Sequence, residues 1–179
     1  HLDIAFDDGT IVRYTDPRRF GAMLWIAGPQ PAHALLDSLG PEPLSPDFDA
    51  THLHAVAKGR SVSVKEFIMN GRVVVGVGNI YAAESLFKAG IAPQREAGNI
   101  SRAKCQALAA AIKSILSHAI ARGGTTLRDF LNADGAPGYF EQELFVYGRE
   151  GLPCKVCGRP VQDLRMSNRA SAWCKKCQK

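Results

Sequence analysis

Apolar and polar residues alternate over the first fifteen positions of the chain, HLDIAFDDGTIVRYT, with a break at Asp8-Gly9. Alternation on both sides of an Asp-Gly pair is typical of a β-hairpin. The run AMLWI, residues 22–26, predicts a third strand. A hairpin and one further strand do not form a stable sheet alone. We therefore expect the sequence to be a fragment that begins inside a larger sheet.

The middle of the chain has the apolar spacing and the capping residues of helices. A short helix is expected within 31–39. Further helices are expected from the cap Ser45 to Lys58, from the cap Ser61 through 62–69, from Asn79 to Gly90, and from Ser101 to Gly123. The apolar face of the last helix consists of Cys105, Leu108, Ala109, Ile112, Leu116 and Ala119. Three prolines within 40–46 predict an inter-domain linker, and short strands are expected after Tyr139.

The stretch VVVGVGNIYAAESLF, residues 73–87, has the pattern of a strand, a glycine-rich turn and a helix, which many phosphate sites share. Tyr81 stands where the dinucleotide fingerprint needs its third glycine, and no Gly-Lys-Ser/Thr follows, so neither nucleotide motif is present. Two interpretations remain open. Gly76 and Gly78 allow an anion to approach the helix N-terminus, or they allow close packing while Asn79 caps the helix.

Four cysteines form the most specific motif. Cys154 and Cys157 make one Cys-x₂-Cys pair, and sixteen residues later Cys174 and Cys177 make another. This spacing predicts one tetrahedral, structural Zn²⁺ site, with two disulfides as the alternative. Cys105 lies on an apolar helix face and is expected in the core.

Charge points to a polyanionic partner or to a solvated basic tail. The chain has a net charge of +5. Residues 149–179 hold eight basic and two acidic residues, so the excess lies there. No apolar stretch reaches the length of a membrane span and no signal peptide opens the sequence, so a cytoplasmic protein without a membrane partner is expected.

The loop DPRRFG, residues 16–21, places two arginines beside an aromatic residue, which suits binding to a DNA duplex. Alternatively, this is a surface loop with Phe20 in the core.

These motifs together resemble the formamidopyrimidine-DNA glycosylase family, bacterial enzymes that excise oxidised purines. The resemblance covers essentially the whole chain and rests on YTDPRRFGAMLW, LGPEPLSPDF, VVVGVGNIYAAESLF, GIAPQR, GGTTLRDF, DGAPGYF, VYGREGLPC and the cysteine pairs. It implies an α+β fold with three parts. Partial β-sandwich strands and a linker occupy 1–40, an all-α helix-two-turn-helix domain occupies 41–148, and a C-terminal Cys₄ zinc ribbon occupies 149–179.

The resemblance also implies residue roles in DNA binding. Asn79 and Arg169 match residues that grip the DNA backbone beside the lesion. Arg18 and Phe20 match residues that fill the hole left by the flipped nucleotide. Arg19 matches a structural or phosphate contact, and Lys65 a lysine near the DNA cleft with no fixed role. The loop that closes over the extruded base is matched by Asp134, Gly135, Gly138 and Tyr139.

By resemblance, the activity is that of a DNA glycosylase with abasic-site β,δ-lyase activity in base-excision repair. In the family, an N-terminal proline amine attacks the damaged nucleotide, aided by a glutamate and a lysine. No catalytic residue of this set is present in the chain, so residues 1–179 alone are expected to be inactive. The expected partner is double-stranded DNA with oxidised bases or abasic sites, bound by a monomer at the bacterial nucleoid. The alternatives are an endonuclease VIII-type glycosylase for oxidised pyrimidines and a non-catalytic zinc-dependent DNA-binding module.

Overall fold

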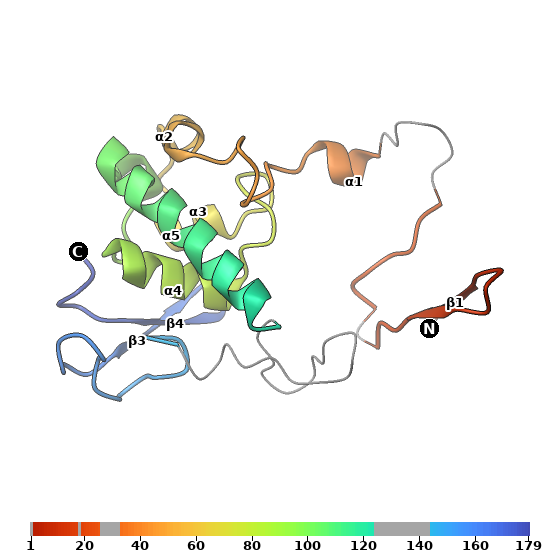
Figure 1. Ribbon diagram of the computed structural model, residues 1–179. Helices are drawn as coiled ribbons and strands as arrows, with labels where there is room; N and C mark the ends of the chain where they lie inside the picture. The colour runs from red at the N-terminus through yellow and green to blue at the C-terminus, as the bar shows by residue number, and fades with distance from the viewer. Residues whose placement is uncertain (1, 18, 26–32, 124–143) are drawn as a thin grey trace. The chain divides into compact units, whose positions relative to one another are not determined.

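The computed structural model describes residues 2–17, 19–25, 33–123 and 144–179 (Figure 1). The chain divides into two compact units, His1–Asp37 and Ser38–Lys179. No helix in the described residues is both long enough and apolar enough to cross a membrane.

The first unit contains the predicted hairpin. Strand β1 (Leu2–Ala5) pairs antiparallel with β2 (Ile11–Tyr14). The turn is closed by the Asp8 carboxylate, which accepts the Thr10 backbone N–H at 2.8 Å, and Gly9 has a positive φ of 84°. The expected third strand is wrong for residues 22–25, which form no strand. An extended segment becomes a strand only by pairing, and the described part of this unit offers it no neighbour.

The short helix is found where it was expected, and two further helices begin at different residues from those predicted. The helix expected in 31–39 is a single turn, α1 (Ala34–Asp37). Helix α2 (Ala50–Ala57) is capped by Asp49, because the Ser45 hydroxyl donates to the Glu42 carbonyl within a turn. Helix α3 (Val64–Ile68) is capped by Ser63 rather than Ser61, and Ser63 with Glu66 forms a capping box.

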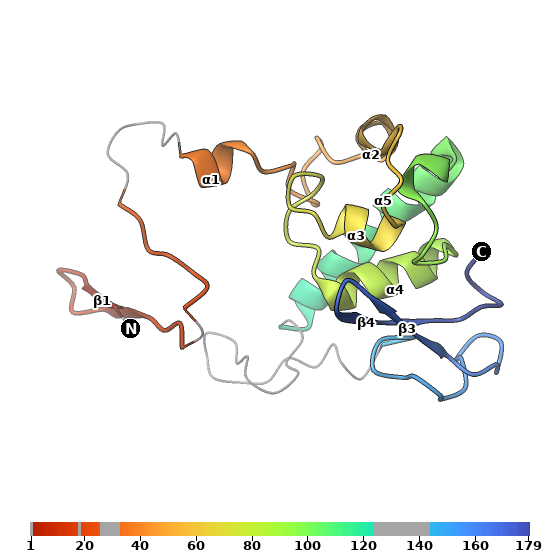
Figure 2. The same cartoon turned by 180° about the vertical axis from the view of Figure 1, so that it is seen from behind.

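The two long helices agree with the sequence. Helix α4 (Asn79–Ala89) ends at Gly90 in the left-handed conformation, and α5 (Arg102–Ala121) is capped by Ser101. All six residues predicted for the apolar face of α5 are buried. A 3₁₀ turn, Ala97–Asn99, precedes α5. Helix α4 lies between α5 on one side and the last two strands on the other (Figures 1 and 2).

The predicted strand before α4 is wrong, because residues 71–76 form successive turns. These turns are held by residues outside them: the Gly40 N–H donates to the Gly71 carbonyl at 2.8 Å, and His52 Nε2 lies 2.8 Å from the Val73 carbonyl. Val74 remains in the core at 1% exposure. Successive turns thus connect helix α3 to helix α4.

The C-terminal segment forms a small hairpin of β3 (Gln162–Met166) and β4 (Arg169–Trp173). Ser167 and Asn168, which join the strands, have positive φ angles of 44° and 62°. The segment packs on α4 through a cluster in which Ala83 and Phe87 meet Val146, Val161, Ala172 and two cysteines. About thirty-six residues bury too little apolar surface to fold alone, so α4 supplies much of their core.

Buried polar groups hold this segment on α4. Glu84, 2% exposed, accepts the backbone N–H groups of Phe145, Val146 and Tyr147 at 2.8 to 2.9 Å. At the other end of α4, the Gln178 amide donates to the Ile91 carbonyl at 2.9 Å and accepts the Cys174 N–H at 2.8 Å. One end of the segment is therefore tied to α4 and the other to Ile91, just beyond the end of that helix.

Candidate metal centre and nucleic-acid interface

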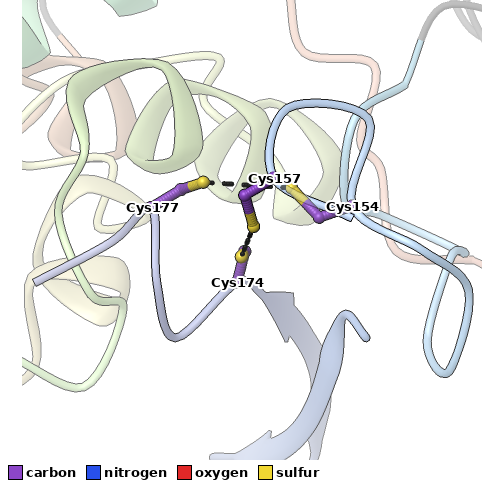
Figure 3. A group of neighbouring side chains, drawn as sticks. All are labelled: Cys154, Cys157, Cys174 and Cys177. Carbon is purple, nitrogen blue, oxygen red and sulfur yellow. Dashed lines mark hydrogen bonds between the residues drawn. The ribbon is translucent and has the colours of Figure 1, made fainter. Parts of the chain in front are cut away.

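The four cysteines predicted as metal ligands converge on one point (Figure 3). Their sulfur atoms all lie within 4.8 Å of one another. Cys157 and Cys174 are 3.4 Å apart at Sγ, and Cys154 and Cys177 are 3.9 Å apart. A tetrahedron with Zn–S bonds of about 2.3 Å has S···S edges of about 3.8 Å. The cluster therefore fits a zinc ion.

Local backbone bonds present each pair of thiols. The Cys154 N–H donates to the Arg159 carbonyl at 2.8 Å, and the Gly158 N–H donates to the Cys154 carbonyl at 2.9 Å. The second pair is turned by the bond from the Gln178 N–H to the Cys174 carbonyl, also 2.9 Å. All four cysteines are free thiols, at distances well beyond the roughly 2.05 Å of a disulfide. The disulfide alternative is not what the structure shows.

Burial and crowding among the thiols disfavour ionisation of Cys177. Burial, then hydrogen bonds from Cys157 and the other thiols, raise the pKa of Cys177 to about 12. A bound Zn²⁺ reverses this effect by displacing the protons. Four thiolates would fill the coordination sphere of a tetrahedral zinc ion, which would leave no open position for catalysis.

A second group of predicted residues meets beside the tip of the β3–β4 hairpin. Arg169 is exposed at the start of β4. The carbonyl of the next residue, Ala170, accepts from Lys65 Nζ at 2.9 Å and from Asn79 Nδ2 at 3.2 Å. Residues from α3, α4 and β4, far apart in the sequence, thus share one backbone oxygen. Lys65, expected near a DNA cleft, has its ammonium inside this junction, and the residue is 2% exposed.

The N-terminus of α4 lies at the same place and carries no side-chain cap. Asn79 is the first helical residue, and Gly78 is the N-cap. Among the described residues, a Cβ atom built on Gly76 or Gly78 meets nothing within 4 Å, so the packing of these residues does not require glycine there. Gly76 has a positive φ of 74°, which explains the glycine there. Within the part of the chain that the structure describes, no side chain caps the first N–H groups of α4.

The loop at residues 16–21 of the first unit is held by hydrogen bonds to one carboxylate. The Asp16 carboxylate accepts the Gly21 N–H at 2.7 Å and the Tyr14 hydroxyl at 3.1 Å. These bonds, led by that of Gly21, lower the pKa of Asp16. Arg19 has a positive φ of 57°, and Phe20 is 81% exposed, so the expectation of a Phe20 in the core does not describe this unit.

Five predicted site residues lie outside the described part of the chain. They are Arg18, Asp134, Gly135, Gly138 and Tyr139.

Sequence reasoning missed two groups that build this surface. Glu84 holds the ribbon on α4, and its signal was a charged residue inside the otherwise apolar stretch IYAAESLF. Ser171 accepts from Lys65 Nζ at 2.5 Å, and no feature of the sequence marks it.

Known proteins share this combination of features. The model of the formamidopyrimidine-DNA glycosylase H2TH domain matches residues 39–131, more than half of the chain. The zinc finger found in FPG and IleRS matches residues 151–179. The chain belongs to the formamidopyrimidine-DNA glycosylase family.

Individual relatives agree. A formamidopyrimidine-DNA glycosylase of Stenotrophomonas maltophilia is 61% identical over 182 aligned residues, covering the whole of this chain and 66% of the relative. The crystal structure of MutM (Fpg) from Thermus thermophilus superposes with a TM-score of 0.76 at 40% identity, over 80% of this chain and 55% of that one. Lactococcus lactis Fpg in complex with Fapy-dG-containing DNA superposes with a TM-score of 0.73 at 31% identity, over 81% of this chain and 52% of that one.

Removing the metal is expected to unfold the ribbon. Cys177→Ser should fail to retain stoichiometric zinc and should lower the midpoint of thermal unfolding, because metal binding supplies the folding energy of so small a segment. The affinity for zinc should fall as the pH falls, because protons compete for the four thiolates. Elemental analysis and circular dichroism measure both effects.

Cys105→Ala is the matched control. Cys105 is a buried thiol outside the cluster, so this variant should keep its zinc. A wild-type chain that holds no metal and shows two disulfides by mass spectrometry would contradict the zinc site.

Proposed function

We propose that this chain binds double-stranded DNA containing oxidised bases or abasic sites, in the base-excision repair of oxidised purines. The observation that carries the proposal is that Asn79, at the N-terminus of α4, donates to the carbonyl of Ala170, the residue that follows the exposed Arg169. One structural zinc ion holds the hairpin that carries Arg169.

The chemistry of this point suits a phosphate. Arg169 is an exposed guanidinium with several donors. The Asn79 amide nitrogen has two hydrogens and gives only one to Ala170, so the other is available. The uncapped N–H groups and the dipole of α4 favour an anion at the same end. Arg169 and Asn79 are therefore proposed to bind one phosphate of the DNA backbone, which orients the duplex without reading its sequence.

The lesion class follows from the relatives. The Lactococcus lactis structure holds DNA with Fapy-dG, an oxidised purine, and the relatives named above are formamidopyrimidine-DNA glycosylases. The endonuclease VIII-type alternative is not favoured. Phe20 and Arg18 are proposed to occupy the space left by the extruded nucleotide, and Asp134–Tyr139 to close over the base. Monomeric action at the bacterial chromosome is part of the same proposal.

The proposed whole activity is that of a DNA glycosylase with β,δ-lyase activity. The chain spans 66% of the length of its Stenotrophomonas relative. Its 179 residues contain none of the three catalytic residues that the family resemblance specifies. Residues 1–179 are accordingly proposed to bind damaged DNA without cleaving it.

Borohydride trapping tests this division. Residues 1–179 should bind an abasic-site duplex more tightly than the matched intact duplex, yet give no covalent product with borohydride, because no proline amine is present to form a Schiff base. The full-length Stenotrophomonas relative serves as the positive control. Efficient trapping that disappears when the N-terminal amine is blocked would contradict the proposal.

Arg169→Ala is expected to weaken binding to damaged and intact duplexes by the same factor. The loss of one phosphate contact should also flatten the slope of log K against log salt concentration by about 0.9. Fluorescence anisotropy between about 50 and 200 mM salt measures both quantities.

Lys88→Ala is the control for net charge. Lys88 lies in the last turn of α4, at the opposite end from Asn79. Its substitution therefore removes one positive charge without changing the proposed phosphate site. Its slope should equal that of the wild type. An unchanged slope in a folded, zinc-loaded Arg169→Ala variant would place Arg169 away from DNA.

Phe20→Ala is expected to lose the preference for abasic DNA by about 1–3 kcal/mol, because an aromatic ring replaces the lost stacking of the extruded base. Since Phe20 is 81% exposed, stability should change by no more than about 0.5 kcal/mol. Trp25→Ala, at a residue that is 94% exposed in the same unit, is the aromatic control and should keep the preference. A destabilised Phe20→Ala with intact preference would show that Phe20 is a core residue.

A further inference from the structure

Lys65 holds the β3–β4 hairpin from inside the protein. Its Nζ donates to the Ala170 carbonyl at 2.9 Å and to the Ser171 hydroxyl at 2.5 Å. The whole residue is 2% exposed and Ser171 is fully buried. A lysine ammonium has three hydrogens, and two of them are committed to β4. Both acceptors follow Arg169 directly in the chain.

Two neighbours hold the same hairpin. Glu66, next to Lys65 on α3, accepts a hydrogen bond from the Ser167 hydroxyl at the hairpin turn. Asn79 donates to the Ala170 carbonyl from the start of α4. Arg169 therefore lies between residues that are fixed on both sides, at 167 and at 170–171.

The position of the Lys65 ammonium disfavours its charged form. Burial first, and then the Arg169 guanidinium, lower the pKa of Lys65 to about 8, against a smaller opposite effect of Glu66. The two hydrogen bonds from Lys65 to β4 offset part of this cost, and they act on the residues that follow Arg169. A cation buried beside another cation costs free energy, and what it provides is a fixed backbone geometry next to Arg169.

We propose that Lys65 is a positioning residue, which fixes Ala170 and Ser171 so that Arg169 presents its donors, beside Asn79, to a single DNA phosphate. Lys65 itself does not contact the DNA. This inference rests on the proposed DNA-binding function and assigns to Lys65 a part in it that differs from a direct contact.

A double-mutant cycle on the 179-residue chain tests the proposal. The variants are Lys65→Met, Arg169→Ala and their combination, and the probe is a duplex with a tetrahydrofuran abasic-site analogue. Lys65→Met should weaken binding on the order of tenfold, the size of one lost charged hydrogen bond. In the Arg169→Ala background, the same change should cost less than about twofold, because its effect passes through Arg169.

Lys104→Met is the matched control. Lys104 Nζ also donates to two oxygens, the carbonyls of Ala89 and Gly90 at 3.2 and 3.0 Å, but at the other end of α4. The variant loses the same charge and the same kind of tether, and its binding should stay within about twofold of the wild type. Ser171→Ala removes one acceptor of Lys65 without changing charge, and should weaken binding in the same direction as Lys65→Met but less.

The outcomes separate three explanations. If Lys65→Met further weakens Arg169→Ala and flattens its salt slope by about another 0.9, Lys65 contacts a phosphate and the proposal is wrong. If folded, zinc-loaded Lys65→Met binds like Lys104→Met while Arg169→Ala is weak, Lys65 is only structural and the inference fails alone. If Arg169→Ala binds like the wild type, the proposed phosphate site fails, and the inference with it.

Discussion

Helix α4 holds the C-terminal segment through one buried carboxylate, and the surface around Arg169 depends on that attachment. Glu84 accepts three consecutive backbone N–H groups of the chain entering the ribbon, while Phe87 from the same helix fills the ribbon's small core. Losing such an acceptor leaves several buried donors without partners, each costing about 1–3 kcal/mol. Because the same helix starts at Asn79, the element that carries the ribbon also provides one side of the candidate phosphate site.

The cysteine cluster and helix α4 contribute differently to the structure of the C-terminal segment. The four thiols bring two distant turns together and give the segment its internal order. Packing on α4, with Gln178 tied to Ile91, sets where that ordered segment lies. Both contribute, because so few residues cannot bury an adequate core and a metal does not orient the ribbon on the helices. Residues 38–179 accordingly form one compact unit.

Local sequence signals were reliable where local physics decides the structure. The bounds of α4 and α5 follow from periodicity, from the Ser101 cap and from Gly90 in the left-handed conformation. Local signals gave wrong predictions where a competing contact changed the role of a residue. Ser45 satisfies the Glu42 carbonyl instead of capping α2, and the valine run before α4 is bent into turns that other segments hold. Propensity predicts a strand for such a run, and tertiary packing overrides it.

By itself, the sequence determined the long helices and the N-terminal hairpin and predicted the cysteine cluster, because spacing, periodicity and turn chemistry act between residues close in the chain. The family followed from the order of motifs along the whole chain. Only the tertiary structure decided that Lys65 and Asn79 both donate to the Ala170 carbonyl of the hairpin. Lys65 and Ser171 are 106 positions apart, and Asn79 and Ala170 are 91 apart. No periodic pattern links residues at such separations. Their contact exists because α3, α4 and β4 pack around one core, and burial then forces each polar group to find its partner.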